Sequence, residues 1–304
     1  MHRLPDGLGF FERGWLSSNN VLISDDNHAV FVDTGYWTHA NQTASLLAEA
    51  LQGKQLTHIV NTHLHSDHCG GNTMLQALYP AVQTLIPPGL ARFVDQWDAE
   101  ALTYTPTGQH CPPFAKNGVL HSGDRLPHFP AWRVYTAPGH DPHSIILFHE
   151  EFRILISADA LWENGFGVVF PEIEGIHAFD EVEQTLEIIE ALKPDLVLPG
   201  HGAMFSDVPA ALARAKTRLA QFRNSPAQHA SYAAKVLIKF KLLELQTVTF
   251  PELIAWAQGC RYLDLLHMRY GGGESYTNWI HSLVIGLEKS NACQFVDENE
   301  IVNI

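Results

Sequence analysis

The stretch from Asn61 to Asn72 constrains this 304-residue chain most, because it gathers three imidazoles and a carboxylate within six residues. It contains the pattern Thr-His-x-His-x-Asp-His-x-Gly. An apolar run, Thr57 to Val60, precedes it, and a helix-like run, Asn72 to Leu78, follows. The cluster is therefore expected on a strand-to-helix loop, where side chains can converge on one point. Imidazole and carboxylate bind zinc and similar divalent ions, so this spacing indicates a metal site rather than a His-rich surface loop.

The stretch resembles the signature of the metallo-β-lactamase-fold hydrolases, including the glyoxalase II-like members. In that family it supplies two ligands to one metal ion, here His63 and His65, and two to a second ion, here Asp67 and His68. The resemblance implies three further ligands downstream, which are a His, a bridging Asp and a last His. Three segments of this chain match those elements in order: Pro138-Gly139-His140, Ala158-Asp159 and Pro199-Gly200-His201.

The implied centre thus holds two divalent ions. One would be bound by His63, His65 and His140, and the other by Asp67, His68 and His201, with Asp159 bridging them. Zinc suits a His-rich site best, and iron and manganese are the alternatives for a mixed His and Asp site.

Other residues are expected near this centre. In the resembled family an Asp-x-Gly at the position of Asp33 supports the ligand-bearing loop, here residues 61–72 and called the metal loop, through hydrogen bonds. The alternative is that Asp33 only forms a turn. His143 stands where family members usually carry a small residue. It is expected either to act in catalysis, by lining the pocket or donating to a substrate carbonyl, or to fill space. Trp162 and Phe166 are expected as pocket walls.

The fold class implied by the resemblance is α/β (α+β), a four-layer αββα sandwich over residues 1–205. Two sheets would pack face to face, with helices such as 38–53 and 180–192 on the outer faces. Residues 89–104 are also predicted to be helical. Residues 105–123 are predicted to form a long loop, either a lid or a surface excursion.

Residues 206–304 are expected to form a mostly helical, winged-helix-like appendage. It has helical patterns at 209–223, 226–246, 251–259 and 276–290, and a terminal hairpin around an Asp297–Glu300 turn. The appendage would wall the cleft or form a subunit contact such as a homodimer interface.

Charge and composition indicate which substrates and which cellular location to expect. Residues 1–203 carry 9 Lys and Arg against 24 Asp and Glu, which argues against nucleic acid as the substrate. No run of eighteen apolar residues exists, so no membrane span is expected. The first residues, Met1 to Gly7, contain no apolar signal-like segment, so a cytoplasmic location is expected. The four cysteines are scattered, which favours reduced, buried thiols, and Cys69 lies inside the metal loop.

The resulting hypothesis is a metal-dependent hydrolase of a small-molecule thioester, lactone, ester or amide. A hydroxide shared by the two ions would be the nucleophile. Asp67 would orient it and carry its proton, and the charge of Asp159 would offset the repulsion between the ions. Three alternatives remain: a phosphodiesterase or nuclease of the same fold, a single-iron enzyme that oxidises persulfides, and a non-catalytic metal-binding protein.

Overall fold

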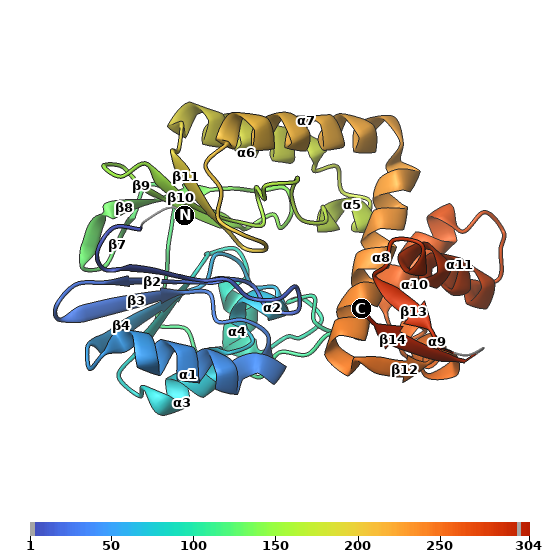
Figure 1. Ribbon diagram of the computed structural model, residues 1–304, viewed down its shortest axis with the longest axis horizontal. Coiled ribbons are helices and arrows are strands. Elements are labelled where there is room, and N and C mark those ends of the chain that lie inside the picture. Colours follow the sequence, from blue (N-terminus) through green and yellow to red (C-terminus); the bar gives the residue numbers. More distant parts are fainter. Residues whose placement is uncertain (1–3, 297–298) are drawn as a thin grey trace.

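The computed structural model describes residues 4–296 and 299–304, and two β-sheets packed face to face form its centre (Figure 1). The first sheet has the order β1-β2-β3-β4-β5-β6. Its strands are β1 (Leu8–Phe11), β2 (Asn20–Ser24), β3 (His28–Val32), β4 (Gln55–Val60), β5 (Gln83–Ile86) and β6 (Gly118–Val119). The second sheet has the order β11-β10-β9-β8-β7. Its strands are β7 (Arg125–Leu126), β8 (Phe129–Thr136), β9 (Ile145–His149), β10 (Ile154–Ala158) and β11 (Leu196–Pro199).

The strands read as continuous apolar runs because both faces of each sheet are covered. Side chains alternate between the faces of a strand. In β2, Val21 and Ile23 therefore enter the core between the sheets, whereas Leu22 packs under the outer helices. In β10, Ile154 and Ile156 point between the sheets and Leu155 points outward.

Helices cover both outer faces, which confirms the expected αββα layering (Figure 1). The first sheet is covered by α1 (Ala40–Leu51) and α3 (Asn72–Leu78), and the second by α6 (Phe179–Leu192) and α7 (Val208–Asn224). Short helices lie in the connections: α2 (Ser66–Cys69), α4 (Ala91–Gln96) and α5 (Phe170–Glu174). Because α7 shares its core with α6 and the second sheet, it packs with the sandwich, and the expected boundary at residue 205 stays a prediction.

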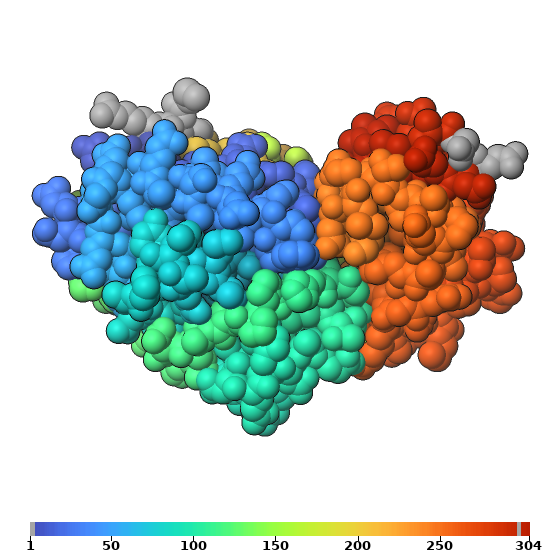
Figure 2. Space-filling model, turned by 90° about the horizontal axis from the view of Figure 1, so that it is seen from below, coloured from blue at the N-terminus to red at the C-terminus, as the bar shows by residue number. Residues whose placement is uncertain are grey.

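The last quarter of the chain has a hydrophobic core of its own. It contains the helices α8 (Pro226–Leu245), α9 (Phe250–Ala257), α10 (Arg261–Tyr270) and α11 (Tyr276–Glu288). It also contains a small antiparallel sheet of order β12-β14-β13, made of β12 (Thr247–Thr249), β13 (Cys293–Phe295) and β14 (Glu300–Asn303). Residues 297–298 of the expected hairpin turn lie outside the described residues. Figure 2 shows the orange surface of this unit lying directly against the blue and green surface of the sandwich.

One prediction about local structure was wrong, and one helix was missed. Helix α4 ends at Gln96 rather than extending to residue 104, because Trp97 adopts a left-handed φ of 50° and the Asp98 side chain accepts hydrogen bonds from the backbone of Glu100 and Ala101. Helix α10 was not predicted, although Tyr262, Leu263 and Leu266 have helical spacing and are buried. Among the described residues, no helix is both long and apolar enough to cross a membrane.

Candidate metal centre

The side chains of the centre come from loops at one edge of the two sheets. The loop after β4 carries His63, His65, Asp67 and His68, and it folds into α2. The three downstream residues follow strands of the second sheet: His140 lies beyond β8, Asp159 follows β10, and His201 follows β11. Loops on a rigid scaffold can place distant residues at one point. Here they gather residues that are 138 positions apart at the extremes, from 63 to 201.

The structure brings all seven expected residues together in overlapping groups. Their ligand atoms lie within 4.8 Å of one another in three sets: His63, His65 and His140; His63, His68 and Asp159; and Asp67, His68 and His201. The first and third sets coincide with the two expected ligand groups. Within the first set, His65 Nδ1 and His140 Nε2 are 2.9 Å apart, so both nitrogen atoms face the same point.

Asp159 lies between the two groups, as its expected bridging position requires. Its Oδ1 is 3.4 Å from His68 Nε2, and its Oδ2 is 3.4 Å from His140 Nε2 and 3.8 Å from His201 Nε2. The preceding residue, Ala158, has a left-handed φ of 46°, and the pairing of β10 with β11 shifts register there. An irregularity of this kind re-aims a side chain beside an active site.

The buried polar atoms of the centre fit divalent ions. His63 Nε2 and His68 Nε2 are fully buried and have no hydrogen-bond partner among the described residues, and such groups are costly unless something coordinates them. Burial lowers the pKa of His63 well below its ordinary value and that of His65 to about 4, so both imidazoles are neutral donors. Burial opposes ionisation of Asp159, but the imidazoles of His201 and His68 outweigh it and hold its pKa well below the ordinary range. Neutral imidazole and carboxylate are the states that bind a metal.

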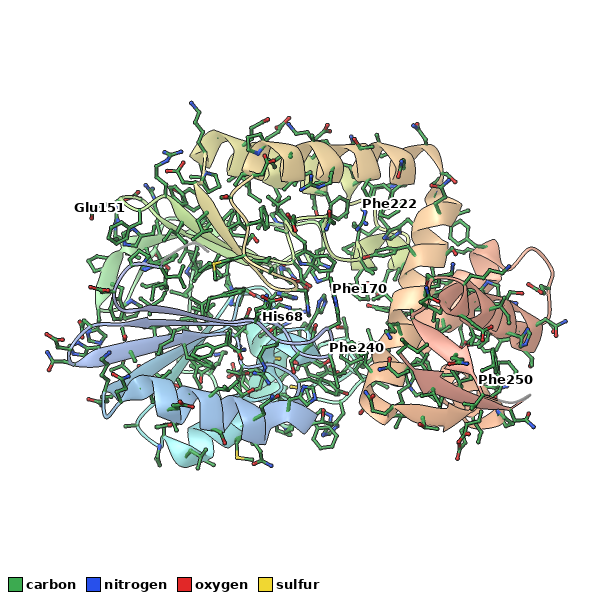
Figure 3. The ribbon with its side chains drawn as sticks, viewed as in Figure 1. His68, Glu151, Phe170, Phe222, Phe240 and Phe250 are labelled. Atoms are coloured by element: carbon green, nitrogen blue, oxygen red, sulfur yellow. The ribbon has the colours of Figure 1, made fainter. Side chains whose placement is uncertain are left out.

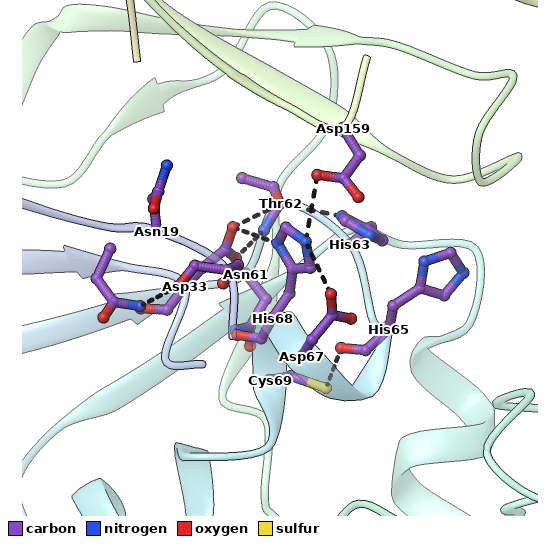
Figure 4. A network of polar contacts seen from close by, with 12 residues as sticks. Asn19, Asp33, Asn61, Thr62, His63, His65, Asp67, His68, Cys69 and Asp159 are labelled. Carbon is purple, nitrogen blue, oxygen red and sulfur yellow. Dashed lines mark hydrogen bonds and ion pairs between the residues drawn. The ribbon is translucent and has the colours of Figure 1, made fainter. Parts of the chain in front are cut away.

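The carboxylate of Asp33 holds the metal loop from behind, as expected (Figure 4). Its Oδ1 accepts from Thr62 N at 2.8 Å, and its Oδ2 accepts from Thr62 Oγ1 and from His68 Nδ1, both at 2.8 Å. The bond to Nδ1 fixes the tautomer of His68 and aims its Nε2 at the centre. Burial by itself would lower the pKa of His68, but the carboxylates of Asp159 and Asp33 raise it well above the ordinary value.

Helix α8 supports His140 through a two-step contact that the sequence did not predict. His140 Nδ1 donates to the carbonyl oxygen of Val168 at 2.6 Å. The N–H of that same peptide group is also held, because Val169 N donates to His229 Nε2 on α8 at 3.1 Å. Burial lowers the pKa of His229 to about 4, so its neutral ring is available as the acceptor. The C-terminal unit thereby orients a candidate metal ligand.

The segment 106–111 joins the C-terminal unit to the metal loop. The carbonyl oxygen of Pro106 accepts from Tyr262 N at 3.0 Å, and that of Gly108 accepts from Trp256 Nε1 at 3.0 Å. From the same segment, Gln109 accepts a hydrogen bond from Ser66 Oγ at 2.5 Å, inside the metal loop. This part of the expected long loop is therefore an ordered wall of the site.

A cavity of about 650 Å³, including its open mouth, reaches the centre. The candidate ligands His65, Asp67, His140, Asp159 and His201 form one side of it. Trp15 and Trp162 flank His201: Trp15 stacks on its ring at 5.3 Å, and Trp162 meets it edge-on at 5.5 Å. Trp162 also donates from Nε1 to Asp159 Oδ1 at 3.2 Å, so it touches the bridging position itself.

Three residues singled out in the sequence do not line the cavity. His143 does not line the cavity: it packs so closely against Gly89 that a Cβ there would lie 2.1 Å from its Nδ1, which favours the space-filling alternative. Phe166 is 1% exposed and packs against Phe222 in the core under α7, so its assignment as a pocket wall was wrong, whereas Trp162 does line the cavity. Cys69 is buried, with its sulfur 3.7 Å from that of Cys111 and facing away from the centre, toward Tyr104.

Sequence reasoning missed the residues that reach the site from elsewhere in the chain. The missed lining residues are Trp15, Val168, Phe170 and the α8 residues Tyr232, Val236, Leu237 and Phe240. The apolar face of 226–246 was visible as a helical pattern, but spacing alone does not show which unit such a face meets.

Comparisons with known proteins agree with this geometry. A sequence model of the metallo-beta-lactamase superfamily matches residues 13–201. The hydroxyacylglutathione hydrolase of Stenotrophomonas maltophilia is 33% identical over 150 residues, which are 49% of this chain and 48% of that protein. The atrochrysone carboxyl ACP thioesterase of Aspergillus fumigatus is 24% identical over 212 residues, 69% of this chain and 42% of that protein. The chain thus spans about half the length of these curated relatives.

Among solved structures, a metallo-beta-lactamase family protein from Thermus thermophilus has a similar fold. The TM-score is 0.58 at 20% sequence identity, and the match covers 99% of this chain and 100% of that one. It therefore includes the C-terminal unit as well as the sandwich.

Proposed function

The chain belongs to the metallo-β-lactamase superfamily of hydrolases, and from this premise we propose that it hydrolyses a small-molecule thioester at a centre of two divalent ions. The observation that carries the proposal is the pair of ligand groups with Asp159 between them, at the side of a cavity. The names of the two curated relatives support a thioester over a lactone or amide, since one is a thioesterase and the other cleaves an acyl group from glutathione. Zinc is the proposed metal, because five of the seven candidate ligands are imidazoles.

The metal ions, when bound, would supply a Lewis acid and a water of lowered pKa. The chain's own residues supply the rest. Asp67 lines the cavity, and the imidazoles of His68 and His201 outweigh its burial and hold its pKa below the ordinary value, so it is a carboxylate. It accepts the proton of the attacking water and passes it to the departing thiolate. The products are a carboxylic acid and a thiol, and no Ser or Cys nucleophile is needed.

The alternative of a nuclease or phosphodiesterase is not favoured by the cavity, because no Lys or Arg is among the described residues that line it. Phosphate groups are normally held by such cations.

The test combines elemental analysis with a hydrolysis screen of thioesters, esters, lactones, amides and phosphodiesters. Two metal ions per chain and turnover of thioesters above the other classes are expected. Asp159→Asn keeps one of the two side-chain oxygen atoms but loses the negative charge. The metal content should therefore fall, and the rate of hydrolysis should drop at least about a hundredfold. Asp195→Asn is the matched control, because Asp195 is exposed and pairs with Arg153 on the surface. Full activity and both metals in Asp159→Asn would contradict the proposal.

A further inference from the structure

We propose that the cavity beside the metal centre is a binding pocket for an apolar, uncharged acyl group, and that Val236 on α8 sets which acyl groups fit. This inference rests on the proposed thioester hydrolysis for its reaction, and it adds the class of substrate. Neither curated relative determines that class, since one is named for a glutathione conjugate and the other for a carrier-bound acyl chain.

Apolar side chains form much of the cavity wall beside the candidate ligands: Val168 and Phe170 come from the sandwich, and Val236, Leu237 and Phe240 come from α8. The uncharged polar residues Thr107, Gln109 and Tyr232 also line the cavity. Phe170 packs edge-on against the rings of His65 and His140, at 4.8 and 5.5 Å, so apolar surface begins directly beside the candidate ligands. Figure 3 shows Phe170 and Phe240 in the region where the sandwich meets α8.

No Lys or Arg is among the described residues that line the cavity. Two cations close to α8 residues already have partners: Lys241 pairs with Glu244 at 2.7 Å, and the guanidinium of Arg218 lies 5.4 Å from the ring of Tyr232. A carboxylate or phosphate placed against this wall would lose hydration without gaining a partner, which is costly. The charged portions of a thiol carrier must therefore stay outside. The mouth beside the exposed Trp15 is where a leaving group would extend.

Contacts near both ends of α8 join it to the sandwich. Tyr36 of the sandwich meets the ring of Phe240 edge-on at 5.0 Å and donates from its hydroxyl to Glu244 at 3.2 Å. At the other end of α8, His229 accepts from Val169 N at 3.1 Å. The helix is thus fixed at both ends relative to the metal centre, and the pocket is preformed. Val236 and Phe240 are four residues apart and share one face of the helix, so a change in the size of residue 236 alters the depth of the pocket without removing the hydrogen bonds made by Glu244 and His229.

The experiment measures binding of a series of carboxylic acids, the proposed products, to the metal-loaded protein by calorimetry. Acetate, butanoate, hexanoate and octanoate are compared with the dicarboxylate of matched length. Affinity is expected to rise about fourfold per added methylene, which corresponds to burying one CH₂ group, until the pocket is full. A second carboxylate at the far end should weaken binding at least about tenfold.

Position 236 gives a paired test. In Val236→Phe the increase in affinity with acyl-chain length should stop at a shorter acid, and in Val236→Ala it should continue to a longer acid. Leu245→Phe is the matched control, because Leu245 lies on the same helix but is 44% exposed and does not line the cavity. It should reproduce the parent profile. Chain-length profiles that are flat, or that are the same in all three variants, would overturn the pocket assignment.

The two proposals fail in different ways. If the acids bind as described but thioesters are not cleaved, the pocket stands and the proposed reaction is wrong. If thioesters are cleaved with kcat/KM values that depend neither on the acyl chain nor on residue 236, the reaction stands and the pocket is wrong.

Discussion

Replacing His229 tests whether helix α8 is joined to the sandwich through a neutral imidazole. His229 is 3% exposed, and its Nε2 accepts from Val169 N at 3.1 Å. An imidazolium has no free lone pair, so only the neutral ring makes this bond. Burial lowers the pKa of His229 from 6.5 to about 4, and the rings of Phe179 and Phe222 are its apolar neighbours.

The sign of the pH effect follows from this lowered pKa. As pH falls, the unfolded chain takes up the proton before the folded protein does. The contribution of His229 to stability is therefore complete above pH 6.5 and is lost as pH falls from 6.5 to about 4. One pKa unit corresponds to about 1.36 kcal/mol, so the free energy of unfolding should lose about 2 kcal/mol from this residue between about pH 8 and about pH 5.

The assay is urea unfolding of the metal-free protein at both pH values, for the parent chain, His229→Gln and His229→Phe. The amide of Gln can accept from Val169 N without titrating, whereas Phe fills the space but leaves that N–H without a partner. Against either variant, the parent should lose about 2 kcal/mol on acidification. His229→Phe should be about 1–3 kcal/mol less stable than His229→Gln at both pH values. A parent-minus-Gln difference that does not change with pH would refute the reasoning.

Two further outcomes are expected. Asp33→Asn should bind metal about 10–100-fold more weakly in a chelator competition, because it loses one of the acceptors that hold Thr62 and His68; unchanged affinity would contradict the role of Asp33. All four cysteines are buried, so a bulky aromatic disulfide reagent should modify no thiol in the folded protein and four after denaturation. Rapid reaction of one thiol in the folded state would show that Cys69 or another cysteine is accessible.

The candidate ligands were predictable because their signal is local. His63, His65, Asp67 and His68 share one short loop, and each downstream ligand follows an apolar strand. Strand ends place side chains at a sheet edge whatever the rest of the fold does. The sandwich was implied by the resemblance to the metallo-β-lactamase-fold hydrolases, and its strands, which are buried on both faces, read as continuous apolar runs in the sequence. Local turn chemistry limited this approach at Asp98, whose side-chain hydrogen bonds end a segment that composition alone suggested was helical.

The C-terminal unit was expected as one possible wall of the cleft, but the residues of that wall were not predictable, because they depend on where one helix docks. On α8, Ala233, Ala234, Leu237 and Ile238 are buried in the core of the C-terminal unit, and Phe240 joins Leu16 and Tyr36 of the sandwich in a separate cluster. A helix with apolar residues on more than one side gives a clear helical pattern, but the pattern does not indicate which face packs against which unit. Only the packed structure shows that one of its faces completes the cavity.

The same docking explains why the metal centre depends on residues far outside its motif. The ring of His140 is oriented by the carbonyl oxygen of Val168. The N–H of the same peptide group, on Val169, is held by His229, 89 positions downstream of His140. The metal loop is also connected to the C-terminal unit: Ser66 donates to Gln109, and the neighbouring Gly108 accepts from Trp256. Both connections end in the C-terminal unit, so that unit orients candidate ligands as well as bounding the cavity. A ligand motif therefore identifies the atoms that would hold a metal, whereas the geometry in which they hold it, and the substrate that can approach it, are set by how the two units pack.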